Sequence, residues 1–184
     1  MKAIHLLPLL VAASTFAGDV RDKVAATATD TAGEERITPD TGIYGMPYGA
    51  SEDAFIAKFG KPTGYFRITD TVSGMLYGKS HVFFFTNGGL SGVRVTHDVF
   101  DWRIANAMPK STTLDLRAWQ LDNGIRDGMS LVEVKRILGD RLSADRYHKF
   151  YLTGRARVDL VFMRTVGKEG DEDATVYGVF VKLK

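Results

Sequence analysis

Residues 128–139 read GMSLVEVKRILG, and a related stretch, GASEDAFIAKFG, occupies residues 49–60. In each copy two glycines stand 11 positions apart (139 − 128 and 60 − 49), and a serine follows the first glycine by two. A shift of 79 positions (128 − 49) superposes the copies and also places Gly45 on Gly124. The sequence therefore predicts a duplicated structural module.

Each copy predicts one short helix between its two glycines. Ser51 and Ser130 are good N-caps, because a serine hydroxyl can accept hydrogen bonds from the exposed amides of the first helical turn. The second glycine of each copy is expected to end the helix, since glycine readily adopts the left-handed conformation found there. The residues that define this structural motif are Gly49, Ser51, Gly60, Gly128, Ser130 and Gly139.

After each helix the period of the apolar residues changes from 3.6 to 2, which predicts strands. In the first copy we expect strands near residues 64–69, 75–78, 81–86 and 90–95, with Asn87-Gly88 as a hairpin turn. In the second copy we expect strands at residues 146–152, 155–165 and 175–183. The predicted fold is α+β: two tandem modules, each a short helix or helix pair packed on an antiparallel meander of three to four strands.

The amino terminus resembles a bacterial secretory signal peptide. A lysine at position 2 precedes an apolar run from Ile4 to Ala13, and small residues near Ala17 suit a signal peptidase. Cleavage near Ala17 would leave 167 residues (184 − 17), in the periplasm or secreted. An uncleaved anchor is the alternative, but the apolar run is about half of the ~20 residues that a membrane span needs.

The rest of the chain divides by composition. Residues 18–42 are small, polar and charged, which predicts a flexible leader; a short helix over residues 20–28 is the competing interpretation. Residues 43–97 form the first predicted module, residues 98–123 a connecting segment, and residues 124–184 the second module.

Composition excludes several classes of function. Without its signal peptide the chain has 23 basic (24 − 1) and 22 acidic residues, so nothing indicates the clustered basic surface that binds nucleic acid. Cysteine is absent, which excludes disulfides, thiolate catalysis and a lipid anchor on cysteine. No later stretch is apolar for long enough to predict a membrane span.

Residues 124–139 (GIRDGMSLVEVKRILG) resemble the G-[IV]-x-x-G-[MD]-[ST]-x-x-[EQ]-V-x-x-[IL]-L-G signature of the SmpA/OmlA (BamE-like) and beta-lactamase inhibitory protein (BLIP-like) superfamily. The first copy is similar, with Phe59 in place of leucine and a helix-ending Gly60-Lys61-Pro62. The tandem arrangement is more similar to the BLIP-like branch. The resemblance implies a helical layer on an antiparallel sheet in each module, with the two sheets side by side forming a concave surface, and a binding protein such as an enzyme inhibitor or envelope assembly factor.

Known catalytic motifs are missing from the sequence. It has no G-x-S-x-G, H-E-x-x-H, phosphate loop or dinucleotide fingerprint. His97, Asp98 and Asp101 do not have the spacing of converging metal ligands. We therefore expect no catalytic residue, no metal and no cofactor; an enzyme would need His97 or His148 beside an acid in a cleft.

Strand alternation predicts where a partner would bind. If Phe66 and Ile68 point into the core, Tyr65 and Arg67 point out, and the same reasoning places alternate residues of the later strands on the face away from the helices. Aromatic, arginine and methionine side chains recur there, as at protein interfaces. The hypothesis names Tyr65, Arg67, Trp102, Trp119, Tyr147, Arg157, Met163 and Phe180 as binding residues. The alternatives are that these side chains cover one another or other segments of the chain, or that the protein is a periplasmic carrier of a small ligand.

Overall fold

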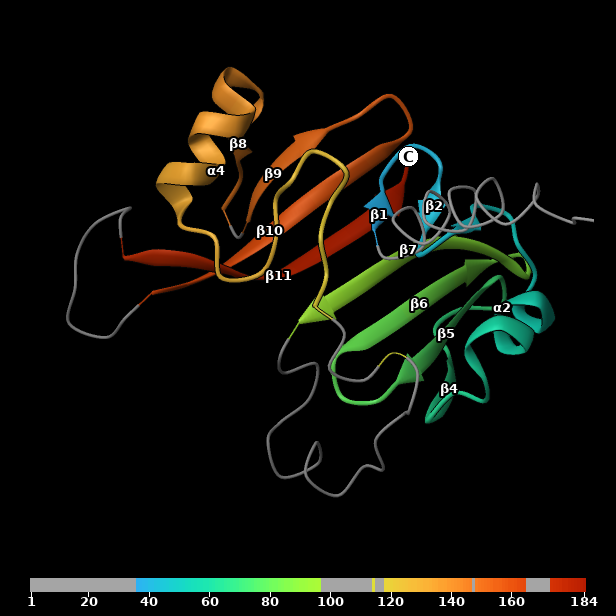
Figure 1. The fold of residues 1–184 in the computed structure, drawn as a ribbon. Helices are drawn as coiled ribbons and strands as arrows, with labels where there is room; N and C mark the ends of the chain where they lie inside the picture. Colours follow the sequence, from blue (N-terminus) through green and yellow to red (C-terminus); the bar gives the residue numbers. More distant parts are fainter. Residues whose placement is uncertain (1–35, 97–113, 115–117, 147, 165–172) are drawn as a thin grey trace, which may run out of the picture.

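One antiparallel sheet of eight strands, in the order β4-β5-β6-β7-β11-β10-β9-β8, organises the protein (Figure 1). The structure is a computed structural model and describes residues 36–96, 114, 118–146, 148–164 and 173–184. The strands of this sheet are β4 (Gly64–Arg67), β5 (Val72–Tyr77), β6 (His81–Thr86), β7 (Gly89–Thr96), β8 (Ser143–Ala144), β9 (Lys149–Leu152), β10 (Ala156–Arg164) and β11 (Ala174–Leu183).

The remaining elements are two helices, α2 (Glu52–Phe59) and α4 (Leu131–Leu138), a 3-10 turn η1 (Gly139–Arg141), and a second sheet with strands β1 (Ile37–Thr38), β2 (Gly42–Ile43) and β3 (Met46–Pro47), all within the described residues. The α+β class is therefore correct. The predicted hairpin is also present, because the two-residue turn Asn87-Gly88 joins β6 to β7 with φ of 51° and 77°.

The expectation of two tandem modules, each with its own sheet, is wrong. Strands β7 and β11, the last strands of the two halves, pair directly with each other, with Val93 opposite Val181. The last strand of a separate meander would leave a row of backbone N–H and C=O groups unpaired. Pairing β7 with β11 removes two such edges at once, and the two sets of strands become one sheet.

The duplication is visible in how each helix is attached to this sheet. Gly49 N–H donates to Leu90 O (2.9 Å) and Leu90 N–H to Ala50 O (2.8 Å). In the second copy, Gly128 N–H donates to Val176 O and Val176 N–H to Met129 O, both at 2.8 Å. Each glycine-framed stretch is thus bonded to the last strand of its own half. Gly49 and Gly128 have φ of 86° and 76°, a conformation that other residues rarely adopt.

The serines cap both helices. Ser51 Oγ accepts a hydrogen bond from Ala54 N–H at 3.2 Å. Ser130 forms a full capping box: its hydroxyl accepts from Glu133 N–H, while the Glu133 carboxylate accepts from Ser130 N–H at 2.9 Å. These bonds satisfy amides that would otherwise lack partners at the first turn. The Ser130 hydroxyl also donates to Glu133 Oε2 at 2.7 Å, and this bond, followed by that from Ser130 N–H, lowers the pKa of the Glu133 carboxyl below its ordinary value.

The end of the predicted flexible leader is ordered. Ile37 is fully buried, donates its N–H to Gln120 O (2.9 Å), and accepts from Asp122 N–H (3.1 Å). Asp40 accepts hydrogen bonds from Thr153 Oγ1 (2.6 Å) and Arg155 N–H (2.7 Å). The prediction of a leader through residue 42 is therefore wrong over residues 37–42, because the polar sequence around Ile37 finds its partners more than 80 positions away in the chain.

All these elements pack on one face of the large sheet and share one core. Phe55 of α2 contacts Phe83 (ring centroids 4.5 Å apart), and Tyr44 of the small sheet contacts the same ring. Val134 of α4 belongs to the same buried cluster as Val158 of β10. The opposite face of the sheet carries neither α2, α4 nor the small sheet, and we call it the helix-free face. None of the described helices is long and apolar enough to cross a membrane.

Candidate functional site

Exposed apolar side chains gather on the helix-free face. Large hydrophobic side chains with substantial exposure there are Phe66 (36%), Ile68 (50%), Leu152 (55%) and Met163 (58%). The strand register places Phe66 of β4, Leu152 of β9 and Met163 of β10 on the face opposite the core residues. A solvated sheet face normally carries polar residues. These exposures therefore mark the helix-free face as a candidate interaction surface.

An apolar groove of about 560 Å³ crosses this face where the two halves of the sheet meet. Phe84 of β6 and Phe180 of β11 lie on opposite sides of β7, with ring centroids 5.4 Å apart. Gly92 of β7 is the cross-strand partner of both Phe84 and Lys182, and because it has no side chain the two rings can contact each other across β7. Ile68 and Val72 extend the apolar lining toward the sheet edge.

Two cationic side chains, Arg94 and Lys182, lie near Phe180. Lys182 lines the groove, and Arg94 is the direct cross-strand partner of Phe180 on β7. The carboxylate beside Phe180 on the other neighbouring strand is that of Asp159, which is bonded to Arg157. The region around the groove is therefore apolar at its centre and positive at its side.

Two of the predicted binding residues lie on the other face. Tyr65 pairs with buried Met75, and its hydroxyl donates to both carboxylate oxygens of Glu52 in α2, at 3.2 and 3.1 Å. Arg67 lines the same cavity as Glu52. The predicted orientation of β4 is therefore reversed: Phe66 points to the helix-free face. Tyr65 and Arg67 combine a long apolar part with a polar end, so this set can pack against α2 as well as face water, and alternation alone did not show which set faces the helices.

The other predicted residues have different positions. Trp119 is in the core and only 3% exposed, so it is not available for a partner. Arg157, Met163 and Phe180 lie on the helix-free face in the strand register. Trp102 and Tyr147 are outside the described residues, as is His97.

Arg157 is the centre of an ion-pair cluster on this face. Its Nη2 lies 2.5 Å from Asp145 Oδ2, and its Nε donates to Asp159 Oδ1 at 2.7 Å. The guanidinium also stacks on Phe150, 3.8 Å from the ring centroid. Hydrogen bonds to Asp159 and Asp145 raise the pKa of Arg157 above its ordinary value. The guanidinium thus gives the carboxylate of Asp159, which is only 5% exposed, a hydrogen-bonding partner of opposite charge.

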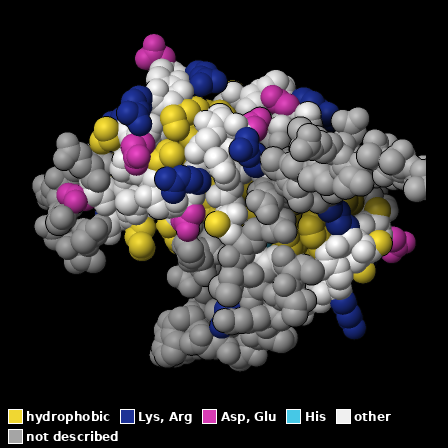
Figure 2. Space-filling model, viewed as in Figure 1, with side chains coloured by type: hydrophobic (Ala, Val, Ile, Leu, Met, Phe, Trp, Pro, Cys, Tyr) yellow, Lys and Arg dark blue, Asp and Glu magenta, His cyan; other side chains and the backbone are white. Residues whose placement is uncertain are grey.

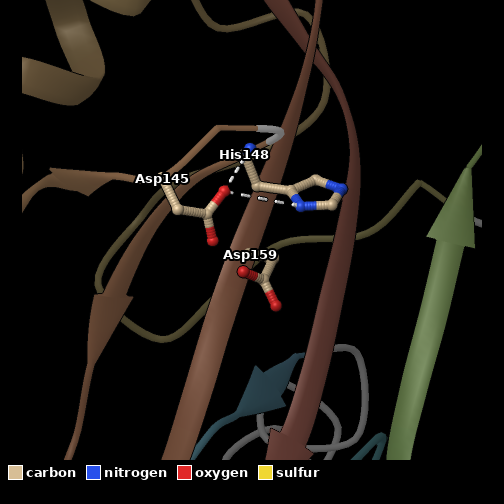
Figure 3. Close-up of side chains that lie close together, drawn as sticks. All are labelled: Asp145, His148 and Asp159. Atoms are coloured by element: carbon tan, nitrogen blue, oxygen red, sulfur yellow. Dashed lines mark hydrogen bonds and ion pairs between the residues drawn. The ribbon is translucent and has the colours of Figure 1, made fainter.

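Ligand atoms of Asp145, His148 and Asp159 lie within 4.8 Å of one another (Figure 3). His148 Nδ1 is 4.0 Å from Asp145 Oδ1, and that oxygen accepts from the His148 backbone N–H at 2.8 Å. A metal ion bound here would compete with the Arg157 guanidinium for both carboxylates. The arrangement is therefore that of an ion-pair network. If His148 acted with Asp145 or Asp159 as an acid–base pair, that carboxylate would also be bonded to the Arg157 guanidinium.

One buried polar residue had no signal in the sequence. His81 is fully buried beneath the small sheet, where its Nε2 is hydrogen-bonded to Tyr44 OH (3.1 Å) and its Nδ1 to Ser80 Oγ (2.8 Å). Its ring also stacks on Phe83. Buried polar groups need such partners, and here they come from residues that are distant in the sequence. The geometry gives His81 a role in attaching the small sheet to β6.

The surface around α4 carries charges of both signs. Figure 2 shows lysine or arginine side chains interspersed with aspartate or glutamate over the part of the surface where α4 lies. In the sequence of α4 and η1, the cationic Lys135 and Arg136 stand between the acidic Glu133 and Asp140. The described residues of α4 and η1 therefore do not form a patch of a single sign that would attract a polyanion.

No protein-family model matches the sequence, and no curated protein matches it. Among solved structures, the fold is similar to a cysteine-rich secretory protein from Staphylococcus aureus subsp. aureus Mu50, with a TM-score of 0.40 and 9% sequence identity. The similarity covers 73% of this chain and 44% of that chain. The chain thus spans less than half of the length of that secreted bacterial protein.

Proposed function

We propose that this chain is an exported bacterial protein-binding module, an inhibitor or envelope accessory factor, that holds its partner on the helix-free face. The observation that carries the proposal is the position of the exposed apolar side chains: Phe66, Ile68, Leu152 and Met163 all lie on that face, and Ile68 lines the groove together with Phe84 and Phe180. The resemblance to BLIP-like and BamE-like binding proteins supports the same function.

The size of the face suits a protein better than a small molecule. Eight strands about 4.8 Å apart make a surface roughly 34 Å across. A standard interface buries about 800 Å² on each partner, with apolar anchors at its centre. An apolar anchor of the partner would bind in the groove, and the rest of the sheet would contact the surface around that anchor.

The charges indicate the chemistry of the partner. Because Arg94 and Lys182 are beside Phe180, the matching surface would carry aliphatic or aromatic side chains flanked by aspartate or glutamate. The proposed partner is therefore a protein segment that is apolar in the middle and acidic beside it.

A matched pair of substitutions tests this proposal. Ile68 and Val132 are exposed to the same extent, 50% and 48%, but Ile68 lines the groove and Val132 is on α4. Peptides are selected from a displayed random library on the immobilised protein, and their affinities are measured by fluorescence anisotropy. We expect acidic–apolar peptides whose binding weakens by about tenfold or more in Ile68→Asp and Lys182→Glu but not in Val132→Asp.

Two results would contradict the proposal. One is a set of selected peptides that bind Ile68→Asp as well as the unmodified chain. The other is a set without acidic residues whose affinity is unchanged by Lys182→Glu. Circular dichroism and thermal unfolding of each variant verify that the fold is intact.

A further inference from the structure

A second cavity, of about 450 Å³, lies at the β4 edge of the large sheet, on the face that carries the helices. Its wall is formed by Glu52 at the start of α2, Tyr65 and Arg67 of β4, the turn Thr69–Ser73, and Asn87 of the β6–β7 hairpin. The volume is within the range of about 300–1,000 Å³ that is usual for small-ligand sites. The lining is mainly polar, whereas most such sites are apolar.

Glu52 is held in position by its neighbours. The Tyr65 hydroxyl donates to both of its carboxylate oxygens, and Ser73 Oγ donates to Oε1 at 2.5 Å. A carboxylate has about four acceptor positions, so these two donors leave capacity for hydrogen bonds from a ligand. The side chain therefore offers a fixed acceptor to the cavity without first losing conformational freedom.

The turn beside it is also ordered. Thr69 Oγ1 accepts from Val72 N–H at 3.1 Å, and Asn87 N–H donates to Thr71 O at 2.7 Å. Arg67 Nη2 donates to Asp70 O at 3.3 Å. A guanidinium has five N–H donors, so Arg67 can keep this bond and still donate to a ligand. The cavity thus presents donors and acceptors around one exposed aromatic ring, that of Tyr65.

We propose that this cavity binds one or two rings of an uncharged saccharide. Each sugar hydroxyl both donates and accepts, which matches the mixed carboxylate, amide, hydroxyl and guanidinium lining. Tyr65, 58% exposed, supplies an apolar ring for the C–H face of a sugar. A phosphate or other anion would face the carboxylates of Glu52 and Asp70, and an apolar ligand would leave the polar groups without partners.

The cavity and the groove on the helix-free face share only Val72 among their lining residues, and binding in the cavity does not depend on the proposed protein partner. Phe66 provides a matched control for Tyr65, because the two are neighbours in β4 but Tyr65 points to the cavity and Phe66 to the opposite face. The full chain, labelled with ¹⁵N, is titrated with cellobiose, maltose and N,N′-diacetylchitobiose, and backbone amide shifts are followed by NMR.

We expect at least one disaccharide to shift the amides of Arg67, Thr69–Ser73 and Asn87. Binding should weaken by about tenfold in Tyr65→Ala and in Glu52→Gln and stay unchanged in Phe66→Ala. Glu52→Gln preserves the shape of the side chain, so it tests recognition even if Tyr65→Ala fails to fold. Absence of shifts at these amides with all three disaccharides, or shifts that persist in both cavity variants, would overturn binding of free sugars.

Co-sedimentation with cellulose, chitin and peptidoglycan sacculi distinguishes a free sugar from a polysaccharide. Disaccharide shifts without co-sedimentation indicate a free sugar, and co-sedimentation that is lost in Tyr65→Ala but kept in Phe66→Ala indicates a polymer. Either result supports the site. Absence of both effects, or co-sedimentation that is equal in the two variants, refutes it.

Discussion

Replacing Phe55 with alanine should destabilise the whole molecule, including the strands of the second half. Phe55 is fully buried, and its ring centroid lies 4.5 Å from that of Phe83, 4.6 Å from Phe59, 5.6 Å from Phe85 and 5.7 Å from Tyr77. Truncation of a phenylalanine in such a site costs about 3–5 kcal/mol. For a chain of this length that corresponds to a decrease in Tm of roughly 6–20 °C.

The loss of stability should also appear in the half of the chain that does not carry Phe55. Because β7 pairs with β11 and both helices share one core, unfolding should be one transition. Amide hydrogen exchange of Val158 and Leu160 in β10 should then accelerate by the factor that matches the change in global stability, although neither residue is in the half that carries Phe55. Denaturant unfolding should show a lower midpoint with an unchanged slope.

Val134→Ala is the matched variant, because Val134 is the position 79 residues after Phe55 (134 − 55) and is also fully buried. It should lower the same single midpoint by a smaller amount, since fewer atoms are removed. A Phe55→Ala protein that loses protection in β4–β7 and keeps it in β10 would contradict unfolding as one unit. That result would mean that the two halves are independent units that happen to share a sheet.

Three further predictions concern the helix N-caps, the pH dependence of stability and the burial of Trp119. Ser51→Ala should cost about 0.5–1 kcal/mol and Ser130→Ala about 1–2 kcal/mol by urea unfolding, because only the second serine belongs to a capping box; equal costs would contradict this. The hydrogen bonds to Asp40, first that from a threonine hydroxyl, lower its pKa below the ordinary 3.8. Its contribution to stability is therefore complete above that pH and lost as pH falls through the lowered folded pKa, so the stability difference between the unmodified chain and Asp40→Asn should shrink on acidification below about pH 4; a difference that is constant with pH would refute it. Trp119→Ala should cost about 3–5 kcal/mol because the side chain is 3% exposed, whereas Met163→Ala, at 58%, should change stability by less than about 0.5 kcal/mol. Similar unfolding midpoints for the two would contradict the assignment of the first to the core and the second to the surface.

Local structure followed from local sequence. Helix boundaries came from glycines and cap serines, because these residues act on backbone groups within four positions. Strand β6 was predicted with its observed limits, and its turn at Asn87-Gly88 needs only the left-handed conformation of two residues. The start of β5 at Val72, three residues before the predicted Met75, depended on a threonine side chain that caps the preceding turn.

The candidate sites were harder to predict, because a surface is made from residues that the chain separates. The groove joins Ile68 and Phe84 from the first half to Phe180 from the last strand, and only the β7–β11 pairing brings them together. The saccharide cavity depends on the orientation of β4. Its polar set, Tyr65 and Arg67, turns toward α2 because Glu52 offers hydrogen bonds there.

The repeated stretch at residues 49–60 and 128–139 determined by itself that two short capped helices form, and that each is followed by antiparallel strands. It did not determine that the strands make one sheet, since nothing local specifies which exposed edge a last strand will meet. Tertiary structure decided that pairing, and with it the single core and the position of the helix-free face. The physical reason is that capping and periodicity act within a few residues, while the burial of strand edges and apolar faces is settled only when distant segments come together.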